Sequence, residues 1–281
     1  VILNRFVSIT KPGIIVGNII TVAGGFFLGL QDNVFSIVLF LATLLGMSLV
    51  MAAGCVFNNC IDRDIDAMME RTQNRVMVKN LVSIPVAISY AVLLAILGVV
   101  VLFVFTNLLT VYVALAGLFV YVIVYSLWAK RHSIFGTAVG GVAGAVPPVV
   151  GYCAVTNRFD IGAIIVFAIL FFWQIPHSYA IAIYRHDDYE AASIPVLPVR
   201  KGAASARINM LCYVLLFIVA VALPFVFNYK GGVYLLALLP GLYWLYSAVQ
   251  GFFVTDLIAW ARRFFLISIM VITLVSLMML V

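Results

Sequence analysis

Long apolar runs dominate this sequence, and nine of them are long enough to cross a lipid bilayer. A transmembrane helix needs roughly 20 predominantly apolar residues. Charged residues make up only 9% of the 281-residue chain, while apolar residues make up 66%. We therefore expect an integral membrane protein, with spans at about 12–30, 36–57, 84–105, 108–128, 135–155, 161–184, 206–227, 232–252 and 262–281.

The length and continuity of these runs also decide the fold class. A strand of a membrane β-barrel shows about ten residues of alternating polarity, whereas these runs are longer and do not alternate. The sequence thus predicts an all-α membrane protein, a bundle of nine transmembrane helices. We expect residues 1–281 to form a single polytopic membrane domain.

Basic residues fall almost entirely on one side of the predicted spans. Only Arg158 and Lys230 follow odd-numbered spans, and the other fourteen of the sixteen Lys and Arg residues lie near the N-terminus or follow even-numbered spans. Cytoplasmic loops carry an excess of Lys and Arg, so we expect the N-terminus and the loops after even-numbered spans in the cytoplasm. The net charge of +6 then reflects topology. The expected surrounding partner is the lipid bilayer, and no nucleic-acid partner is expected.

Two long connections, residues 58–83 and 185–205, share the predicted cytoplasmic side. Each begins with acidic residues at helical spacing and then becomes basic. Internal repeats of membrane bundles bring such half-sites together. We therefore expect a cytoplasm-facing active-site cavity where the two loops meet.

The first connection carries a column of polar side chains. Asn58, Asp62 and Asp66 recur every four residues, so on a helix they lie within about 80° of arc on one face. Carboxylates at this spacing repel one another unless a cation offsets them. Mg²⁺ prefers oxygen ligands and is usually bound by one or two carboxylates plus substrate phosphates. The column predicts a magnesium site, with a solvated acidic helix end as the alternative.

Basic residues follow this column at similar spacing. Arg71 and Arg75 are four residues apart and Lys79 is one step further, so we expect them on one face. Arg offers paired donors that suit phosphate oxygens. Together with the predicted magnesium site they indicate a diphosphate ligand, although they also serve to fix topology.

The second connection follows a span that carries a histidine. Tyr184 and Asp188 are four residues apart and are expected to face the same way if the helix continues. His177 lies seven residues before Tyr184, inside the predicted span. Ionisable residues at this depth are costly and usually functional, so we interpret His177 as a functional residue, with a hydrogen-bonded packing histidine as the alternative.

These motifs resemble the UbiA superfamily of intramembrane prenyltransferases. The resemblance rests on "NxxxDxxxD" from Asn58 to Asp66, "RTxxR" from Arg71 to Arg75 and the nine helices. It is greatest to the haem-farnesylating branch, the protohaem IX farnesyltransferases, through "TKPGI" at 10–14, "YSLWAKR" at 125–131, "GAVPPVVGY" at 144–152, "WQIPH" at 173–177 and "DYEAASIPVLPV" at 188–199. Tyr184 stands where many superfamily members have a second-loop Asp.

The resemblance implies transfer of a farnesyl group from farnesyl diphosphate to a vinyl group of haem B, with addition of water. It implies Mg²⁺ as cofactor, a bacterial cytoplasmic membrane, and a terminal oxidase or the haem A synthesis machinery as partner. The implied catalytic residues are Asp62, Asp66, Asp188, Tyr184 and Lys130. The implied metal ligands are Asn58, Asp62, Asp66 and Asp188. The implied diphosphate ligands are Arg71, Arg75, Lys79, Lys130 and Arg131, and His177 is the implied haem ligand.

Three other functions stay open on the sequence. A related prenyltransferase could act on an aromatic quinone precursor or another macrocycle. A cation transporter could use the acidic column as an ion site, although the adjacent arginines would repel a lone cation. A purely structural membrane subunit would leave the Asn58, Asp62 and Asp66 register unexplained.

Overall fold

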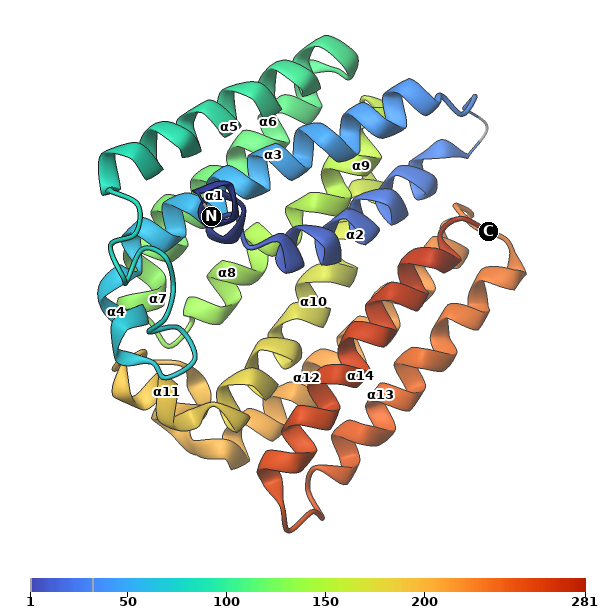
Figure 1. The fold of residues 1–281 in the computed structure, drawn as a ribbon. Coiled ribbons are helices and arrows are strands. Elements are labelled where there is room, and N and C mark those ends of the chain that lie inside the picture. Colours follow the sequence, from blue (N-terminus) through green and yellow to red (C-terminus); the bar gives the residue numbers. More distant parts are fainter. Residues whose placement is uncertain (1, 32) are drawn as a thin grey trace.

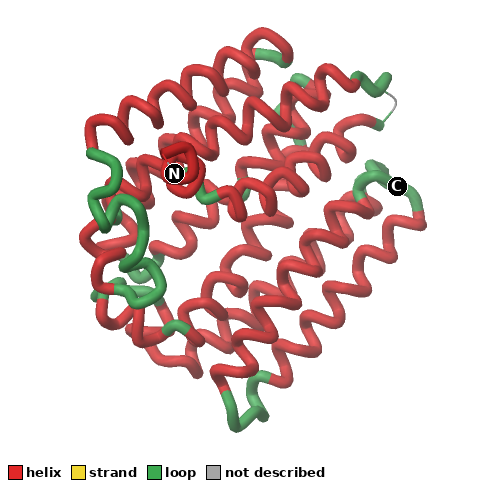
Figure 2. Tube along the Cα trace, viewed as in Figure 1, coloured by secondary structure: helices red, strands yellow, loops and turns green. Residues whose placement is uncertain are grey.

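The computed structural model describes residues 2–31 and 33–281. In this part of the chain, nine helical segments are long and apolar enough to cross a membrane (Figure 1). The segments are Pro12–Leu30, Ile37–Ile61, Ile84–Phe105, Leu108–His132, Gly136–Thr156, Ile161–Tyr184, Leu197–Val226, Gly232–Gln250 and Leu257–Met278. The predicted all-α class and the predicted number of spans are confirmed, and no strand occurs among the described residues (Figure 2).

Several spans consist of more than one element. The single-element spans are α2 (Pro12–Leu30), α3 (Ile37–Ile61), α5 (Ile84–Phe105), α10 (Ile161–Tyr184), α12 (Leu197–Val226) and α14 (Leu257–Met278). The fourth span joins α6 (Leu108–Phe119), the π-helix η1 (Val120–Ala129) and α7 (Lys130–His132). The fifth joins α8 (Gly136–Gly144) to α9 (Val146–Thr156), and the eighth joins the 3₁₀-helix η2 (Gly232–Ala237) to α13 (Leu238–Gln250).

Three short helices lie outside the spans: α1 (Ile2–Ile9), α4 (Arg63–Met68) and α11 (His186–Ala191). The helices α4, α7 and α11 gather at one end of the bundle (Figure 1). These are the ends of the second, fourth and sixth spans. The polar connections therefore meet at one end, as the alternation of the spans predicted.

Apolar side chains cover both the interior and the outer surface of the bundle. Helix α3 packs against α5, α2 against α9, and α10 against α12 and α14. Outward-facing residues such as Leu41 and Phe103 are more than half exposed. Exposed apolar side chains would be costly in water but not in lipid, whose tails are equally apolar. The helices satisfy their own backbone hydrogen bonds, as the bilayer core requires.

The seventh and ninth helices begin earlier than predicted. Helix α12 starts at Leu197 and contains a break at Gly202, whose φ of 77° is accessible to glycine because it lacks a Cβ atom. Helix α14 starts at Leu257 and includes Arg262 and Arg263. Hydropathy marks the apolar part of a span, whereas its helix continues for one or two turns beyond the apolar segment.

Glycines let the fifth span approach its neighbours closely. A Cβ atom on Gly140 would lie 2.9 Å from the Tyr125 ring, and one on Gly144 would lie 1.9 Å from Gln174 Oε1. Glycine at every fourth position, Gly136, Gly140 and Gly144, thus permits close packing of this span against its neighbours. Pro147 and Pro148 follow in the first turn of α9, where proline is tolerated.

Candidate active site

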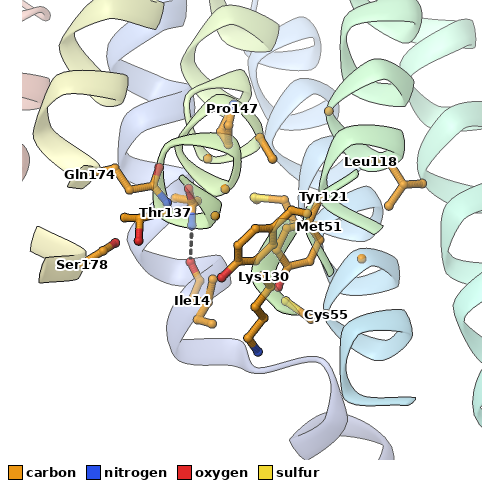
Figure 3. Close-up of a pocket in the computed structure, with 18 of the residues that line it drawn as sticks. Ile14, Met51, Cys55, Leu118, Tyr121, Lys130, Thr137, Pro147, Gln174 and Ser178 are labelled. Atoms are coloured by element: carbon orange, nitrogen blue, oxygen red, sulfur yellow. Dashed lines mark hydrogen bonds between the residues drawn. The ribbon is translucent and has the colours of Figure 1, made fainter. Parts of the chain in front are cut away.

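A cavity of about 290 Å³ lies among α2, α3, the fourth span, α8 and α10. Its apolar wall includes Met47, Val50 and Leu118, whereas Lys130 and Tyr189 lie toward the α4 and α11 end. Figure 3 shows Pro147 at the upper end of the drawn side chains and the amino group of Lys130 at their lower end. The cavity thus offers an elongated apolar ligand a path from a polar end into the bundle.

The acidic column stands at the polar end of this cavity. Asp62 joins α3 to α4, and the backbone N–H groups of Asp62 and Asp66 donate to the carbonyls of Asn58 and Asp62, each at 2.8 Å. The helical rise therefore continues through the junction. Asn58, Asp62 and Asp66 are all buried, and Asn58 Nδ2 donates to Asp62 Oδ2 at 2.7 Å. The predicted column on one face is confirmed.

Cations from other elements pair with each member of the column. Lys11 Nζ donates to Asn58 Oδ1 at 2.6 Å, and Lys130 Nζ donates to Asp62 Oδ2. Arg75 donates to Asp66 Oδ2 at 2.6 Å. The protein itself thus supplies positive charge to the buried carboxylates, as a column of like charges requires.

Arg131 contacts both the column and the neighbouring acid. Its guanidinium binds Asp64 through two hydrogen bonds of 2.7 Å and lies 3.8 Å from Asp62 Oδ1. This hydrogen bonding lowers the pKa of Asp64 to about 2. Asp64 is exposed, but it orients Arg131.

The prediction that Arg71, Arg75 and Lys79 lie on one helix face is wrong. Helix α4 ends at Met68, Met69 is extended, and residues 70–80 form turns. Thr72 Oγ1 donates to the Asp66 carbonyl at 2.9 Å, a side-chain contact that competes with helix continuation. Arg75 alone of the three contacts the column, while Arg71 and Lys79 are exposed.

The second loop reaches the first through Asp188. Its Oδ1 accepts a hydrogen bond of 2.8 Å from the backbone N–H of Glu70. Beside it, Ile65 and Met69 of the first loop pack with Ile194 and Val196 of the second. The prediction that the two loops meet is confirmed.

Tyr184 and Asp188 were expected to face the same way if the helix continued, but the helix does not continue between them. Helix α10 ends at Tyr184, and the next residue, Arg185, leaves the helical conformation. The Tyr184 ring packs against Phe265 of α14 at 5.9 Å, and the Arg262 guanidinium lies over it. Tyr189 lines the cavity, and burial raises the pKa of its phenol.

His177 lies on α10, as expected, but faces α14. Its ring stacks on Trp173 at 4.5 Å and lies 4.8 Å from Phe265. Gln174 and Ser178 of the same helix line the cavity. At about 100° per residue, these two faces of α10 are neighbours. His177 therefore lies beside the cavity wall without lining it.

The donor set suits Mg²⁺ shared with a phosphate ligand. Asp62 Oδ1 is buried and has no hydrogen-bond partner among the described residues, so an oxygen ligand is available. Asp62, Asp66 and Asp188 do not form a tight three-residue cage. Within the described ranges, the only such group consists of His186, Asp187 and Glu190, at the exposed end of α11. Mg²⁺ normally completes its shell with substrate phosphates and waters, so separated carboxylates fit it.

Several residues at the site had not been assigned a role from the sequence. Lys11 pairs with Asn58, and Ser126 accepts from Asn58 Nδ2 at 3.0 Å. Tyr121 and Tyr125 line the cavity from η1, and Gln174 lines it from α10. In the sequence, each of these residues is only a polar or aromatic side chain within or beside an apolar run. That pattern does not reveal which neighbours the side chain faces.

Comparison with known proteins identifies the family of this chain. Residues 18–270 match the UbiA prenyltransferase family. The chain belongs to this family. It is 52% identical over 277 residues to "Protoheme IX farnesyltransferase 2" of Pseudomonas putida strain GB-1, covering 98% of this chain and 94% of that protein. It is 51% identical over 278 residues to the protoheme IX farnesyltransferase of Pseudomonas syringae pv. tomato, covering 99% and 94%.

Solved structures of UbiA proteins share the fold. A digeranylgeranylglyceryl phosphate synthase superimposes with a TM-score of 0.80 at 16% identity, covering 99% of this chain and 97% of that one. A UbiA homolog from Archaeoglobus fulgidus bound to GPP and Mg²⁺ gives a TM-score of 0.70 at 16% identity, covering 99% and 100%. At this identity the likeness shows the fold alone. The predicted family is confirmed, and its members are prenyltransferases, which removes the transporter and structural-subunit alternatives.

Proposed function

We propose that this UbiA protein transfers a farnesyl group from farnesyl diphosphate to a vinyl group of haem B, with addition of water, to give haem O. The observation that carries this proposal is identity of about half over nearly the full length to protoheme IX farnesyltransferases. The cavity supports it, because an apolar chamber ends at buried carboxylates and cations.

The diphosphate lies at the polar end in this proposal. Asn58, Asp62 and Asp66 on one side and Asp188 on the other would hold Mg²⁺, which supplies Lewis-acid stabilisation of the departing diphosphate. Lys130 and Arg131 contribute fixed positive charge next to Asp62. Arg75 contributes the same beside Asp66. Arg71 and Lys79 are exposed and act only if their loop folds over the diphosphate.

The chemistry follows from this placement of charge. The bond between farnesyl C1 and oxygen breaks, and the electron pair leaves with the diphosphate, toward Lys130 and its neighbouring cations. The vinyl group of haem B donates its π electrons to C1, which forms the new carbon–carbon bond. Water then adds to the resulting cation and loses a proton. The apolar cavity wall protects the allylic cation from premature hydrolysis.

In this proposal haem B, the acceptor, lies against the face of α10 that carries His177, next to the face that lines the cavity. His177 is proposed as the residue that binds haem iron, because neutral imidazole is a common iron ligand. Tyr184 packs on α14 on the same side. We therefore propose that Tyr184 helps to orient haem and does not contact the diphosphate.

The setting of the enzyme completes the proposal. The distribution of Lys and Arg supports a cytoplasmic N-terminus and cytoplasmic active-site loops, in the cytoplasmic membrane of a bacterium. We propose that residues 1–281 form one membrane domain, and that its product passes to a terminal oxidase or to haem A synthesis.

Product analysis tests this function. Detergent-purified protein is incubated with haem B, farnesyl diphosphate and Mg²⁺, and the haem is examined by mass spectrometry. A haem heavier by farnesyl plus hydroxyl is expected. Unmodified haem together with prenylation of an aromatic acceptor would keep the diphosphate site but reject haem as the acceptor.

The metal assignment has its own test. Asp66→Asn keeps the size of the side chain but removes a charge, so turnover and its Mg²⁺ dependence should both be lost while the thermal unfolding profile of the protein persists. Full turnover by Asp66→Asn would remove Asp66 from the metal site. Glu70→Gln, at an exposed acid four residues further on, is the matched control.

A further inference from the structure

Ser268 of α14 is buried and makes two short contacts through one hydroxyl group. Its Oγ donates to the carbonyl oxygen of Phe265 at 2.6 Å. The same Oγ lies 2.7 Å from Nδ1 of His177. Each contact needs a hydrogen, and a serine hydroxyl carries only one.

The count of hydrogens fixes the tautomer of His177. A carbonyl oxygen cannot donate, so the hydrogen between Ser268 and Phe265 belongs to Ser268. The hydrogen between Ser268 and His177 must then belong to Nδ1. A neutral imidazole carries one N–H, and an uncompensated imidazolium would be costly at this depth. Nε2 therefore carries the lone pair.

Neighbouring side chains hold this arrangement in place. The His177 ring lies between Trp173 and Phe265. The Trp173 indole N–H donates to the backbone carbonyl of Ser268 at 2.8 Å. Both the ring plane and the position of Ser268 are thus fixed, while Nε2 has no hydrogen-bond partner within the described part of the chain.

We propose that Ser268 is a positioning residue that holds His177 in the Nδ1–H tautomer and so presents the Nε2 lone pair to the iron of haem B. This inference rests on the proposed function, since that function supplies the iron porphyrin. Partners of this kind set the orientation and basicity of ligating histidines, and their loss typically costs about 10- to 100-fold in affinity. Ser268 itself touches neither iron nor farnesyl diphosphate in this arrangement.

Haem binding without farnesyl diphosphate tests the inference. The full-length protein in detergent is titrated with ferric haem B, and Kd and the Soret band are recorded. We expect Ser268→Ala to weaken binding about 10- to 100-fold and to change the Soret band toward that of His177→Ala. Ser268→Thr, which keeps a hydroxyl, should restore both. Ser276→Ala, at another buried serine of α14, is the matched control and should bind as wild type.

Added imidazole separates ligation from packing. In His177→Gly, imidazole from solution should restore the wild-type Soret band, because a free imidazole takes the place of the missing ring without being attached to the chain. Equal Kd and spectra for Ser268→Ala and Ser276→Ala would overturn the role of Ser268. A wild-type spectrum in His177→Ala would overturn the whole inference. Failure of the proposed function is distinguishable, because it appears as unmodified haem in the product analysis while haem binding is scored separately.

Discussion

Asp188 accepts a hydrogen bond of 2.8 Å from the backbone N–H of Glu70, which joins two loops at positions 118 residues apart in the chain. The carboxylate is buried and its second oxygen lies 4.0 Å from Arg185. The first loop has turns instead of a helix after Met68. Its position therefore depends on this contact and on the apolar residues beside it.

Removing Asp188 should release the first loop. A hydrogen bond to a charged group contributes about 1.5–3 kcal/mol, so Asp188→Ala should increase opening of residues 70–80 at least about tenfold. Trypsin cleavage after Arg71 measures this opening. Asp187→Ala, at the exposed neighbouring acid, should leave cleavage unchanged; equal cleavage in both variants would contradict the prediction.

Lys130 should be essential for stability as well as turnover. Asp62 is fully buried, and Lys130→Met leaves its carboxylate without its nearest cation. Breaking one side of a buried ion pair costs about 3–5 kcal/mol, so the thermal unfolding midpoint should fall clearly. The double variant Lys130→Met/Asp62→Asn should regain stability but not turnover. A double variant no more stable than Lys130→Met would mean that the pair does not stabilise the fold.

Lys11 should give the reaction a pH dependence. Burial, with repulsion from Arg75, lowers the pKa of its ammonium group from 10.5 to about 8. The unfolded chain therefore binds more protons between these values, and this group makes folding more favourable as the pH rises through that window. In the folded protein the charge beside Asn58 is lost as the pH rises through about 8, so KM for farnesyl diphosphate should increase above pH 8.

An arginine at position 11 separates this effect from others. Lys11→Arg keeps its charge throughout, and KM should then stay constant as the pH rises. Lys201→Arg, at an exposed lysine, should keep the wild-type increase. A wild-type pH profile in Lys11→Arg would exclude Lys11 as the titrating group.

Met47 should limit the length of the isoprenoid. It lines the cavity and precedes Asp62 by fifteen residues, or about 22 Å of helix. Met47→Ala should lengthen the apolar end and shift the ratio of kcat/KM from farnesyl toward geranylgeranyl diphosphate. The expected change is at least about tenfold, as apolar pockets discriminate by about 1–3 kcal/mol. Competition assays measure the ratio, and Leu45→Ala, at an outward-facing residue of α3, should leave it unchanged.

The acidic column could be predicted because it depends only on local geometry. Asn58, Asp62 and Asp66 share a face by their spacing, and the helical hydrogen bonds continue through Asp62. The same rule was wrong for Tyr184 and Asp188, because α10 ends between them. Spacing predicts a shared face only where the helix is continuous.

The sequence by itself determined the nine spans, the charge bias and the polar column of Asn58, Asp62 and Asp66. Each follows from bilayer thickness or from helical periodicity, which act within one segment of the chain. The tertiary structure decided that Lys11 pairs with Asn58, that Asp188 holds the first loop, and that Ser268 faces His177. These contacts join segments far apart in sequence, and the direction of each side chain depends on how the helices pack, which no local pattern specifies.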